Sequence, residues 1–172
     1  MGATTIPTRL ATADDAVVLA NLLHDFNVEF DTPSPGVEFL VTRLRQLLPG
    51  DGTFAVLAGD PVLGFGLVTL RTNVWFEGRV ALLDELYVRP DRRDQGIGSV
   101  LIDRLEAECR ARDVDYVEIN VDESDVDTQR FYDRHGYAGV DPDTGERAYY
   151  FSKELGPSSA FAIGSNLSRL EP

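Results

Sequence analysis

Apolar residues recur at helical or alternating spacing along the first half of the chain, and this pattern predicts its elements. Apolar positions three and four residues apart predict two amphipathic helices, over residues 16–26 and 37–48. Segments with strand character lie on either side of this helical pair: Ile6–Leu10, 53–60, 61–71 and 79–88. The chain therefore begins with a strand, continues through two helices, and then forms three antiparallel strands.

The second half alternates between helical and strand-like patterns. It predicts a helix over about 96–112, a strand at 114–121, a short helix at 127–135 and a closing strand at 147–155. A helix between the fourth and fifth strands is a crossover, which makes those two strands parallel. We therefore expect an α/β (α+β) domain over residues 1–155 with a mixed sheet, followed by a tail, 156–172, of unassigned structure.

Local signals refine the helix boundaries. Thr12 followed by Asp15 is similar to a capping box at the start of the first helix. Ser34-Pro35 is typical of the start of the second helix. In the helix after residue 96, we expect four residues to face the core: Val100, Leu101, Leu105 and Cys109.

Composition indicates one folded domain with a strong negative charge. The 172 residues are 43% apolar and carry a formal net charge of −13, so neither nucleic acid nor an anionic membrane is expected as a partner. The single cysteine excludes an intramolecular disulfide, and His24 and His135 are expected to be surface or capping residues, so no metal site is predicted. A basic-then-apolar leader and an apolar run of about 18 residues are both missing, so a cytoplasmic protein outside the membrane is expected.

Two arginines and two glycines stand where the third long helix begins. Arg92-Arg93 precedes Gly96-Ile97-Gly98, which opens the helix. The first N–H groups of a helix have no intrahelical partner and carry about half a positive charge, and glycine lets a phosphate approach the backbone. The third glycine of a dinucleotide fingerprint and the Gly-Lys-Ser/Thr of a phosphate loop are both missing. These residues predict an anion site, with a plain tight turn as the alternative.

The segment around this turn resembles a family motif. "LLDELYVRPDRRDQGIGSVLI" is similar to the acetyl-CoA-binding motif of GNAT-type N-acetyltransferases, a strand followed by Arg-x-x-Gly-x-Gly/Ala at the next helix. Arg93, Gly96 and Gly98 fill that motif here. Further on, "QRFYDRHGY" matches the family's Phe-Tyr-x-x-x-Gly-Phe/Tyr. The resemblance covers about Ile6 to Leu155 and implies the GNAT fold, a mixed, mostly antiparallel sheet of six to seven strands flanked by about four helices.

By this resemblance, acetyl-CoA is the co-substrate, and main-chain N–H groups from about Arg93 to Ser99 hold its pyrophosphate. Arg92 or Arg93 neutralises the charge, while the Asp94 side chain is expected to point to solvent. The parting of the fourth and fifth strands exposes amides to the thioester carbonyl and to pantetheine. The cofactor-binding set implied in this way is Leu86, Tyr87, Val88, Arg92, Arg93, Asp94, Gln95, Gly96, Ile97, Gly98, Ser99, Asp125 and Phe131.

Two positions depart from the family pattern. Asp125 stands where members often carry an Asn that helps to hold the pantetheine arm, and Thr128 stands where they often carry Ala. An ionised Asp accepts hydrogen bonds but cannot donate them.

The implied reaction is direct attack of an amine on the acetyl thioester. It needs a base for the amine, a donor for the oxyanion and a hydrogen bond or proton for the departing thiolate. Tyr132 is the expected group at the sulfur, the alternative being an aromatic residue packed in the core. Full proton transfer from a phenol with pKa near 10 to a thiolate whose thiol has pKa near 8.5 is uphill by about 2 kcal/mol, so hydrogen-bond donation is favoured.

Glu85 is preferred to Asp84 as the base. Adjacent strand residues face opposite sides of a sheet, so at most one of the two points at the site unless a bulge intervenes. A structural ion pair, a contact with the substrate ammonium and a water relay to a more distant carboxylate remain open alternatives.

Acidic residues favour a small cationic amine as the acceptor. One acidic stretch precedes the Tyr132 helix, and a second lies where the family builds its acceptor pocket: Asp122, Glu123, Asp125 and Asp127 in the first, Glu29, Asp31 and Glu38 in the second. Solvated loops are the alternative. Trp75-Phe76 is expected at a hairpin tip, as a pocket lip, a cover for the core edge or a dimer contact, which leaves a homodimer open.

Two other functions compete with a small-molecule acetyltransferase. One is acetylation of a protein N-terminus or lysine. The other is a non-catalytic module that binds acyl-CoA, against which the complete glycine motif and Tyr132 argue.

Overall fold

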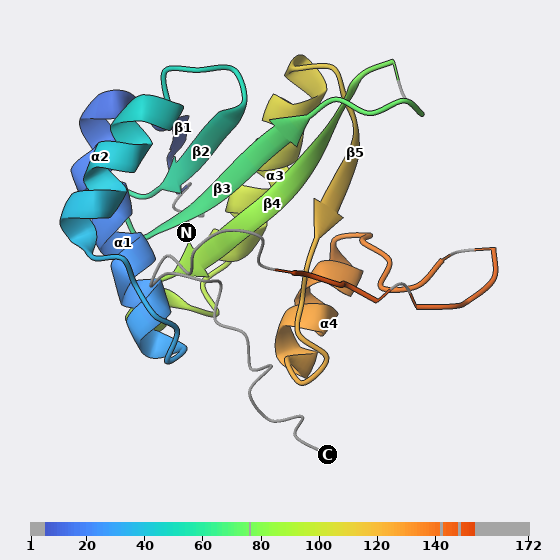
Figure 1. Cartoon of the computed structure of the whole chain (residues 1–172). Helices are drawn as coiled ribbons and strands as arrows, with labels where there is room; N and C mark the ends of the chain where they lie inside the picture. The colour runs from blue at the N-terminus through green and yellow to red at the C-terminus, as the bar shows by residue number, and fades with distance from the viewer. Residues whose placement is uncertain (1–5, 76, 142, 148, 154–172) are drawn as a thin grey trace.

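A computed structural model describes residues 6–75, 77–141, 143–147 and 149–153 of the chain (Figure 1). The strands are β1 (Thr8–Leu10), β2 (Thr53–Ala58), β3 (Gly64–Arg71), β4 (Arg79–Val88) and β5 (Val114–Ile119). The helices are α1 (Ala16–Glu29), α2 (Val37–Leu47), α3 (Ile97–Ala111) and α4 (Val126–Arg134), with short 3-10 turns η1 (Ala13–Asp15) and η2 (Pro90–Arg92). The order of elements predicted from the apolar pattern is confirmed as far as α4.

The five strands form one mixed sheet in the order β1-β2-β3-β4-β5. Neighbouring strands from β1 to β4 are antiparallel, and β5 pairs with β4 in parallel. Helix α3 makes the crossover between β4 and β5, which is the connection that a parallel pair requires. The predicted mixed sheet and its α/β class are therefore confirmed.

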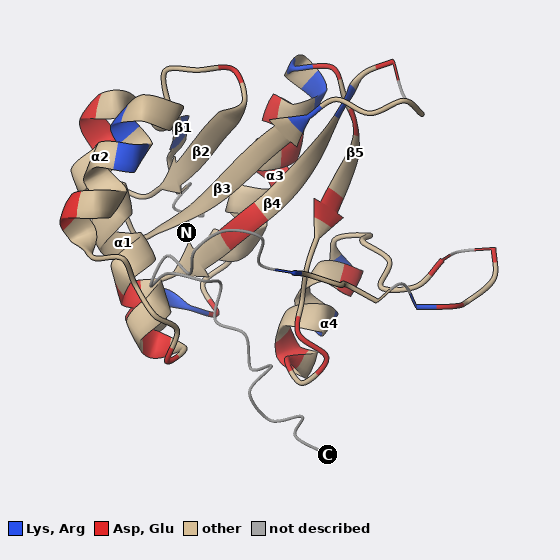
Figure 2. Cartoon of the chain, in the orientation of Figure 1, with Lys and Arg blue, Asp and Glu red and all other residues tan. Residues whose placement is uncertain are grey.

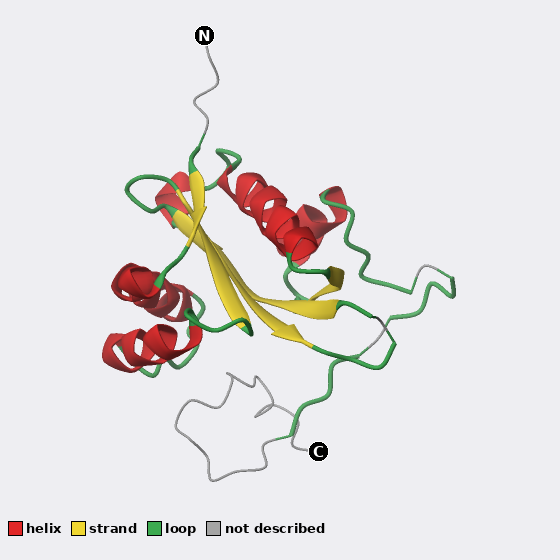
Figure 3. Cartoon of the chain, turned by 90° about the horizontal axis from the view of Figure 1, so that it is seen from above, coloured by secondary structure: helices red, strands yellow, loops and turns green. Residues whose placement is uncertain are grey.

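Helices cover both faces of this sheet (Figure 3). Residues of α1 and α2 pack on one face in a cluster that includes Leu19, Leu57, Phe65 and Tyr87. Helix α3 packs on the opposite face, with Leu101 and Leu105 in a second cluster. All six residues of β2 are buried, because this strand lies between the two helical layers, and its sequence is accordingly a nearly continuous apolar run.

The closing strand predicted at 147–155 is wrong for its described residues. Residues 147 and 149–153 have no regular secondary structure, and the side chains of Tyr149, Tyr150 and Phe151 are exposed. The hairpin turn before them does form, because Asp141 N–H donates to the Glu146 carbonyl at 2.8 Å. A strand also needs neighbouring N–H and C=O groups, and the apolar pattern of one segment does not supply them. The described part of the sheet therefore has five strands, fewer than the expected six to seven.

Three local predictions have mixed outcomes. The Thr12–Asp15 link is confirmed, since Thr12 N–H donates to the Asp15 carboxylate at 2.8 Å. Helix α2 begins at Val37, as its apolar pattern predicts, but the start signal at Ser34-Pro35 lies in the preceding loop, where the Ser34 hydroxyl accepts the Gly36 N–H at 3.2 Å. Val100 is only partly buried, because the face of α3 that meets the sheet also carries Ile97 and Ile102.

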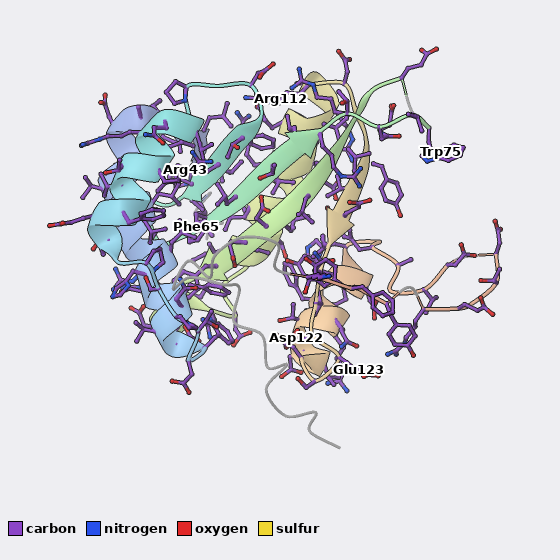
Figure 4. The ribbon with its side chains drawn as sticks, in the orientation of Figure 1. Arg43, Phe65, Trp75, Arg112, Asp122 and Glu123 are labelled. Carbon is purple, nitrogen blue, oxygen red and sulfur yellow. The ribbon has the colours of Figure 1, made fainter. Side chains whose placement is uncertain are left out.

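Phe76 and the tail 156–172 lie outside the described residues. Trp75, at the β3–β4 connection, extends away from the sheet (Figure 4) and is 86% exposed. No helix in the described ranges has the length and apolar character needed to cross a membrane.

Candidate active site

The turn between β4 and α3 is built around two left-handed backbone positions. Gly96, the N-cap residue of α3, has φ +78°, and Asp94 has φ +59°. Glycine adopts the left-handed region without the steric cost that a Cβ brings. A Cβ built on Gly96 would meet nothing within 4 Å, so the space above this residue is open. The backbone at the start of α3 is thus accessible from outside.

The first N–H groups of α3 have no acceptor among the described residues. Those of Gly96, Ile97, Gly98 and Ser99 donate to no backbone or side-chain oxygen of the described residues, and the first helical bond runs from Val100 N–H to the Gly96 carbonyl at 3.1 Å. Helix α3 has 15 residues, long enough for a substantial dipole at this end. Four free donors at a helix start, with open space at Gly96, fit a phosphate or diphosphate group.

Gly98 has a second role, in packing. A Cβ at this position would lie 3.1 and 3.2 Å from two ring carbons of Phe131, closer than ordinary contact. The missing Cβ therefore lets α4 approach the first turn of α3. Phe131 also packs on His135, with ring centroids 4.4 Å apart.

His135 joins the same corner by hydrogen bonds. Its Nδ1 lies 2.8 Å from the Phe131 carbonyl, which can only accept, so this nitrogen carries the proton. Its Nε2 lies 3.0 Å from the Ser99 hydroxyl. His135 is the C-cap residue of α4, so its predicted capping role is confirmed. Its side chain also links the end of α4 to the first turn of α3, which no sequence pattern indicated.

Strands β4 and β5 separate beside this turn. Their parallel pairing runs from Arg79↔Val114 to Leu83↔Ile119, whereas β4 continues to pair with β3 as far as Val88. Arg89 N–H donates to the Leu63 carbonyl on the β3 side at 3.0 Å. Because donor direction alternates along a strand, the N–H groups of Leu86 and Val88 point away from β3, into the gap left by β5.

A bulge in β4 determines where its two carboxylates point. Leu67 pairs with Glu85 and Val68 with Leu83, so Asp84 is skipped in the register. The Thr69 hydroxyl donates to Asp84 at 2.6 Å, and Thr69 lies on the same sheet face as Leu67. Asp84 and Glu85 therefore share the face on which α1 and α2 pack. Adjacent residues of a regular strand point to opposite faces of the sheet, and we expected this of Asp84 and Glu85 unless a bulge intervened. The bulge is present, and it places both side chains on the same face.

The pKa values at this site reflect burial. Burial, with a further contribution from the Asp84 charge, raises the pKa of Glu85 to about 7. Burial also raises the pKa of Asp84, against which the Thr69 hydrogen bond acts. Burial, followed by the charges of Glu85 and Asp125, raises the pKa of Tyr132 above its ordinary value, so this phenol stays protonated at neutral pH. The site thus combines a carboxyl that titrates near neutrality with a permanent O–H donor.

Tyr132 comes from α4 and is 8% exposed. Its ring contacts Phe131 and Tyr137, at centroid distances of 5.2 and 5.6 Å. Tyr132 is thus packed in the α3-side cluster, as the alternative interpretation predicted. This packing does not exclude a role for its hydroxyl group.

The side chains of several predicted cofactor residues are buried or bonded within the protein. Tyr87 is 5% exposed and packs in the α1–α2 cluster, and Ile97 is 2% exposed in the α3 cluster. Asp125 caps α4 by accepting the Thr128 N–H at 3.0 Å, which occupies one of its carboxylate oxygens. Asp94 and Gln95 are exposed, as expected for Asp94.

The two arginines of the turn have different partners. Arg92 is exposed, and its Nε lies 3.2 Å from Asp91, which is exposed too. Arg93 pairs with Glu29 at the end of α1, with N–O distances of 2.7 and 2.8 Å. The expectation that either arginine neutralises a phosphate did not foresee this second ion pair, which joins residues 64 positions apart.

Acidic residues are distributed over several elements around the site (Figure 2). Red segments appear on β4, at the tip of β5, at the end of α1 and next to α4. Asp122 and Glu123 lie in the loop that precedes α4 (Figure 4), and Glu123 pairs with Arg147 at 3.3 Å. Within the described ranges, no group of three or more His, Cys, Asp and Glu residues is placed to hold a metal ion.

Comparison with known proteins identifies relatives. Residues 19–137 match the model of the acetyltransferase (GNAT) family. A structure from Arthrobacter sp. FB24, provisionally named an acetyltransferase, is 42% identical, with a TM-score of 0.84 over 90% of this chain and 99% of that chain. An aminoglycoside acetyltransferase from an uncultured soil metagenomic sample, solved with sisomicin, is 18% identical and shares the fold, with a TM-score of 0.71 over 88% of this chain and 97% of that one.

A curated relative matches over a shorter stretch. Thialysine N-epsilon-acetyltransferase from Bos taurus is 40% identical over 47 residues, which is 27% of this chain and 27% of the bovine protein. The family model, by contrast, spans most of the chain, and the Arthrobacter structure covers nearly all of it. The chain belongs to the GNAT family of acetyltransferases.

Proposed function

We propose that this protein transfers the acetyl group of acetyl-CoA to a primary amine of a small cationic molecule, by direct attack in a ternary complex. The observation that carries the proposal is the arrangement along β4 and α3. Glu85, with a pKa of about 7, lies on a strand that leads within eleven positions to the unpartnered amides of Gly96–Ser99. A base suited to neutral pH and an anion site therefore lie on one segment of the chain, from β4 through the turn to the start of α3.

The main chain of the turn holds and orients the co-substrate in this proposal. The amides of Gly96–Ser99 bind its diphosphate, and the amides of Leu86 and Val88 face the gap where the thioester lies. Acetyl-CoA supplies the activated acyl group. The N–H groups at the gap donate to the carbonyl oxygen as negative charge develops on it.

Glu85 acts as the general base, and Tyr132 donates a hydrogen bond to the leaving group. The Glu85 carboxylate accepts a proton from the substrate ammonium, directly or through a water molecule, and the neutral amine nitrogen then bonds to the carbonyl carbon. The C–S bond breaks, and the second proton of that nitrogen passes to the departing thiolate, which leaves as the coenzyme A thiol. The Tyr132 hydroxyl donates a hydrogen bond to the departing thiolate. Because its pKa is raised, Tyr132 is a poorer acid than free phenol, which favours hydrogen-bond donation over full transfer.

Charge supports a cationic acceptor. Asp84 and Glu85 lie on one sheet face, and none of the described Lys, Arg and His residues lies within ion-pair distance of either. A carboxylate pair with no cation of the protein's own favours an ammonium group as its partner. Related proteins named for thialysine and aminoglycoside acetylation act on amines of this kind.

A free-thiol release assay tests the proposed activity. Acetyl-CoA is incubated with the full chain and a panel of polyamines, an aminoglycoside, lysine analogues and a peptide with a free N-terminus. We expect amine-dependent thiol release that is fastest with a small polycationic amine. Release only with the peptide would favour the protein-acetylating alternative, and binding of coenzyme A without turnover on any amine would favour a non-catalytic module.

The pH dependence of kcat/KM checks the role of Glu85. Since the deprotonated carboxylate is the active form, kcat/KM should rise with pH through about 7, the pKa of Glu85. Asp84→Asn removes a negative charge that raises this pKa, so we expect the rise to move to lower pH. Glu85→Gln should abolish this rise. The only pH dependence of kcat/KM that remains should come from deprotonation of the substrate amine itself. An unchanged rise in Glu85→Gln would assign the base to another group.

A further inference from the structure

The Arg93 side chain is held at three points by protein groups. Its Nη1 and Nη2 donate to the two carboxylate oxygens of Glu29, at 2.7 and 2.8 Å. Its Nε donates to the Val88 carbonyl at 3.0 Å. The guanidinium carbon lies 5.7 Å from the centroid of the Tyr87 ring. A planar guanidinium in a bidentate pair is fixed in both position and orientation.

These contacts connect three elements around the anion site. Val88 is the last residue of β4, Arg93 lies just before the left-handed positions of the turn, and Glu29 is the last residue of α1. The bond from Arg93 Nε to the Val88 carbonyl closes the short segment 88–93 on itself. The pair with Glu29 then ties that segment to the helix that precedes the α1–α2 connection.

The Arg93–Glu29 pair lies next to a row of aromatic side chains. Tyr87 is 5% exposed and contacts Phe26 of α1 with ring centroids 5.7 Å apart. Phe26 in turn contacts Phe30 at 4.9 Å. The Glu29 side chain is 27% exposed and that of Arg93 40% exposed, so the pair lies at the edge of this aromatic row and not free in solvent.

A bidentate phosphate contact by Arg93 would break this arrangement. Three of the five N–H groups of Arg93 are already used, including both that form the bidentate face toward Glu29. Arg92 differs, because its Nε contacts only the neighbouring exposed Asp91 among the pairs described. The charge that can turn toward a bound diphosphate without loss of structure is therefore that of Arg92.

We propose that Arg93 and Glu29 are positioning residues that act as one unit: their ion pair fixes the diphosphate-binding turn against β4 and α1, and Arg93 does not itself contact the diphosphate. The inference rests on the proposed function, because it assumes that the turn binds coenzyme A. It assigns to Glu29, a residue of α1, a role in the affinity of a site on another element.

The two roles of Arg93 predict opposite effects of Glu29→Gln. If Arg93 contacted the diphosphate, loss of the competing carboxylate would free it and strengthen coenzyme A binding. If the pair positions the turn, Glu29→Gln loosens the turn and weakens binding. We expect calorimetric titration with coenzyme A to give an affinity about tenfold weaker for Glu29→Gln and for Arg93→Gln alike.

A double-mutant cycle on the same titration isolates the coupling. The Glu29→Gln/Arg93→Gln protein should bind coenzyme A no more weakly than either single variant, because the unit is already broken. Arg92→Gln is the matched control, because it removes a neighbouring charge without breaking the Arg93–Glu29 ion pair. The loss of binding free energy that it causes should therefore add to the loss caused by Glu29→Gln. Losses that add for Glu29 and Arg93 would overturn the proposal, as would tighter binding by Glu29→Gln.

Arg93→Lys separates charge from geometry, and it serves if Arg93→Gln does not fold. Lysine keeps the charge but cannot form the bidentate pair together with the Val88 bond. We expect Arg93→Lys to bind coenzyme A as weakly as Arg93→Gln does, with a higher KM for acetyl-CoA and an unchanged kcat. Wild-type affinity in Arg93→Lys would contradict the proposal. A flat titration of the wild-type protein would instead overturn the proposed function itself, and this inference with it.

Discussion

Replacement of Tyr132 by Phe is expected to lower kcat by about 100- to 1,000-fold, while coenzyme A affinity stays near that of the wild type. The Tyr132 ring fills its place in the α3-side cluster, and Phe retains that ring. What the variant loses is the hydroxyl, which remains a donor at neutral pH because burial raises its pKa. An interaction made with the leaving thiolate but not with the ground state lowers kcat without weakening binding.

Tyr137→Phe is the matched control for this variant. Tyr137 is a second partly buried tyrosine in contact with Tyr132, but its hydroxyl donates to Glu106 at 3.2 Å. We expect this variant to keep nearly wild-type turnover in the thiol-release assay. Equal losses in both variants would point to a packing effect, and wild-type turnover in Tyr132→Phe would exclude Tyr132 from the chemistry.

Gly96→Val is expected to weaken coenzyme A binding by about 100-fold or more, an effect of about 3 kcal/mol. A β-branched residue is strongly disfavoured at φ +78°, so the backbone is expected to move and the four amides to lose their present arrangement. The Val side chain would also occupy the open space above Gly96, where the phosphate is expected. Calorimetry with coenzyme A measures the loss.

Gly145→Val controls for the backbone strain alone. Gly145 also has a left-handed backbone, φ +72°, with open space where a Cβ would be, but it lies in the Asp141–Glu146 turn. A comparable strain there should leave coenzyme A affinity unchanged. If Gly96→Val bound coenzyme A as the wild type does, the start of α3 would not be the diphosphate site.

The elements that are predictable from sequence are those that bury a periodic face. Helix α3 and strand β4 were placed almost to the residue, because Leu101 and Leu105 repeat at helical spacing and 79–88 is a long apolar segment. The closing strand failed because Tyr149 and Tyr150 satisfy a strand pattern without having a paired neighbour among the described residues. Periodicity reports which face is apolar, but it does not report what lies against that face.

The candidate site was predictable where it depends on local backbone. Gly96 and Gly98 could be recognised because glycine has few reasons to precede a helix other than a left-handed turn or a close approach, and both reasons apply here. The bulge at Asp84 and the Arg93–Glu29 pair could not be predicted. A register shift depends on the partner strand, and an ion pair across 64 positions depends on the tertiary fold.

The most direct test of the diphosphate site follows the backbone amide signals of Gly96, Ile97, Gly98 and Ser99 by NMR as coenzyme A is added. If these N–H groups bind the diphosphate, their proton resonances should move strongly downfield and saturate with the same affinity that calorimetry gives, while Gly145 stays unmoved. Addition of pantetheine, which lacks the diphosphate, should leave all four nearly unchanged. Saturating coenzyme A that does not shift these amides would place the cofactor elsewhere and contradict the proposed site.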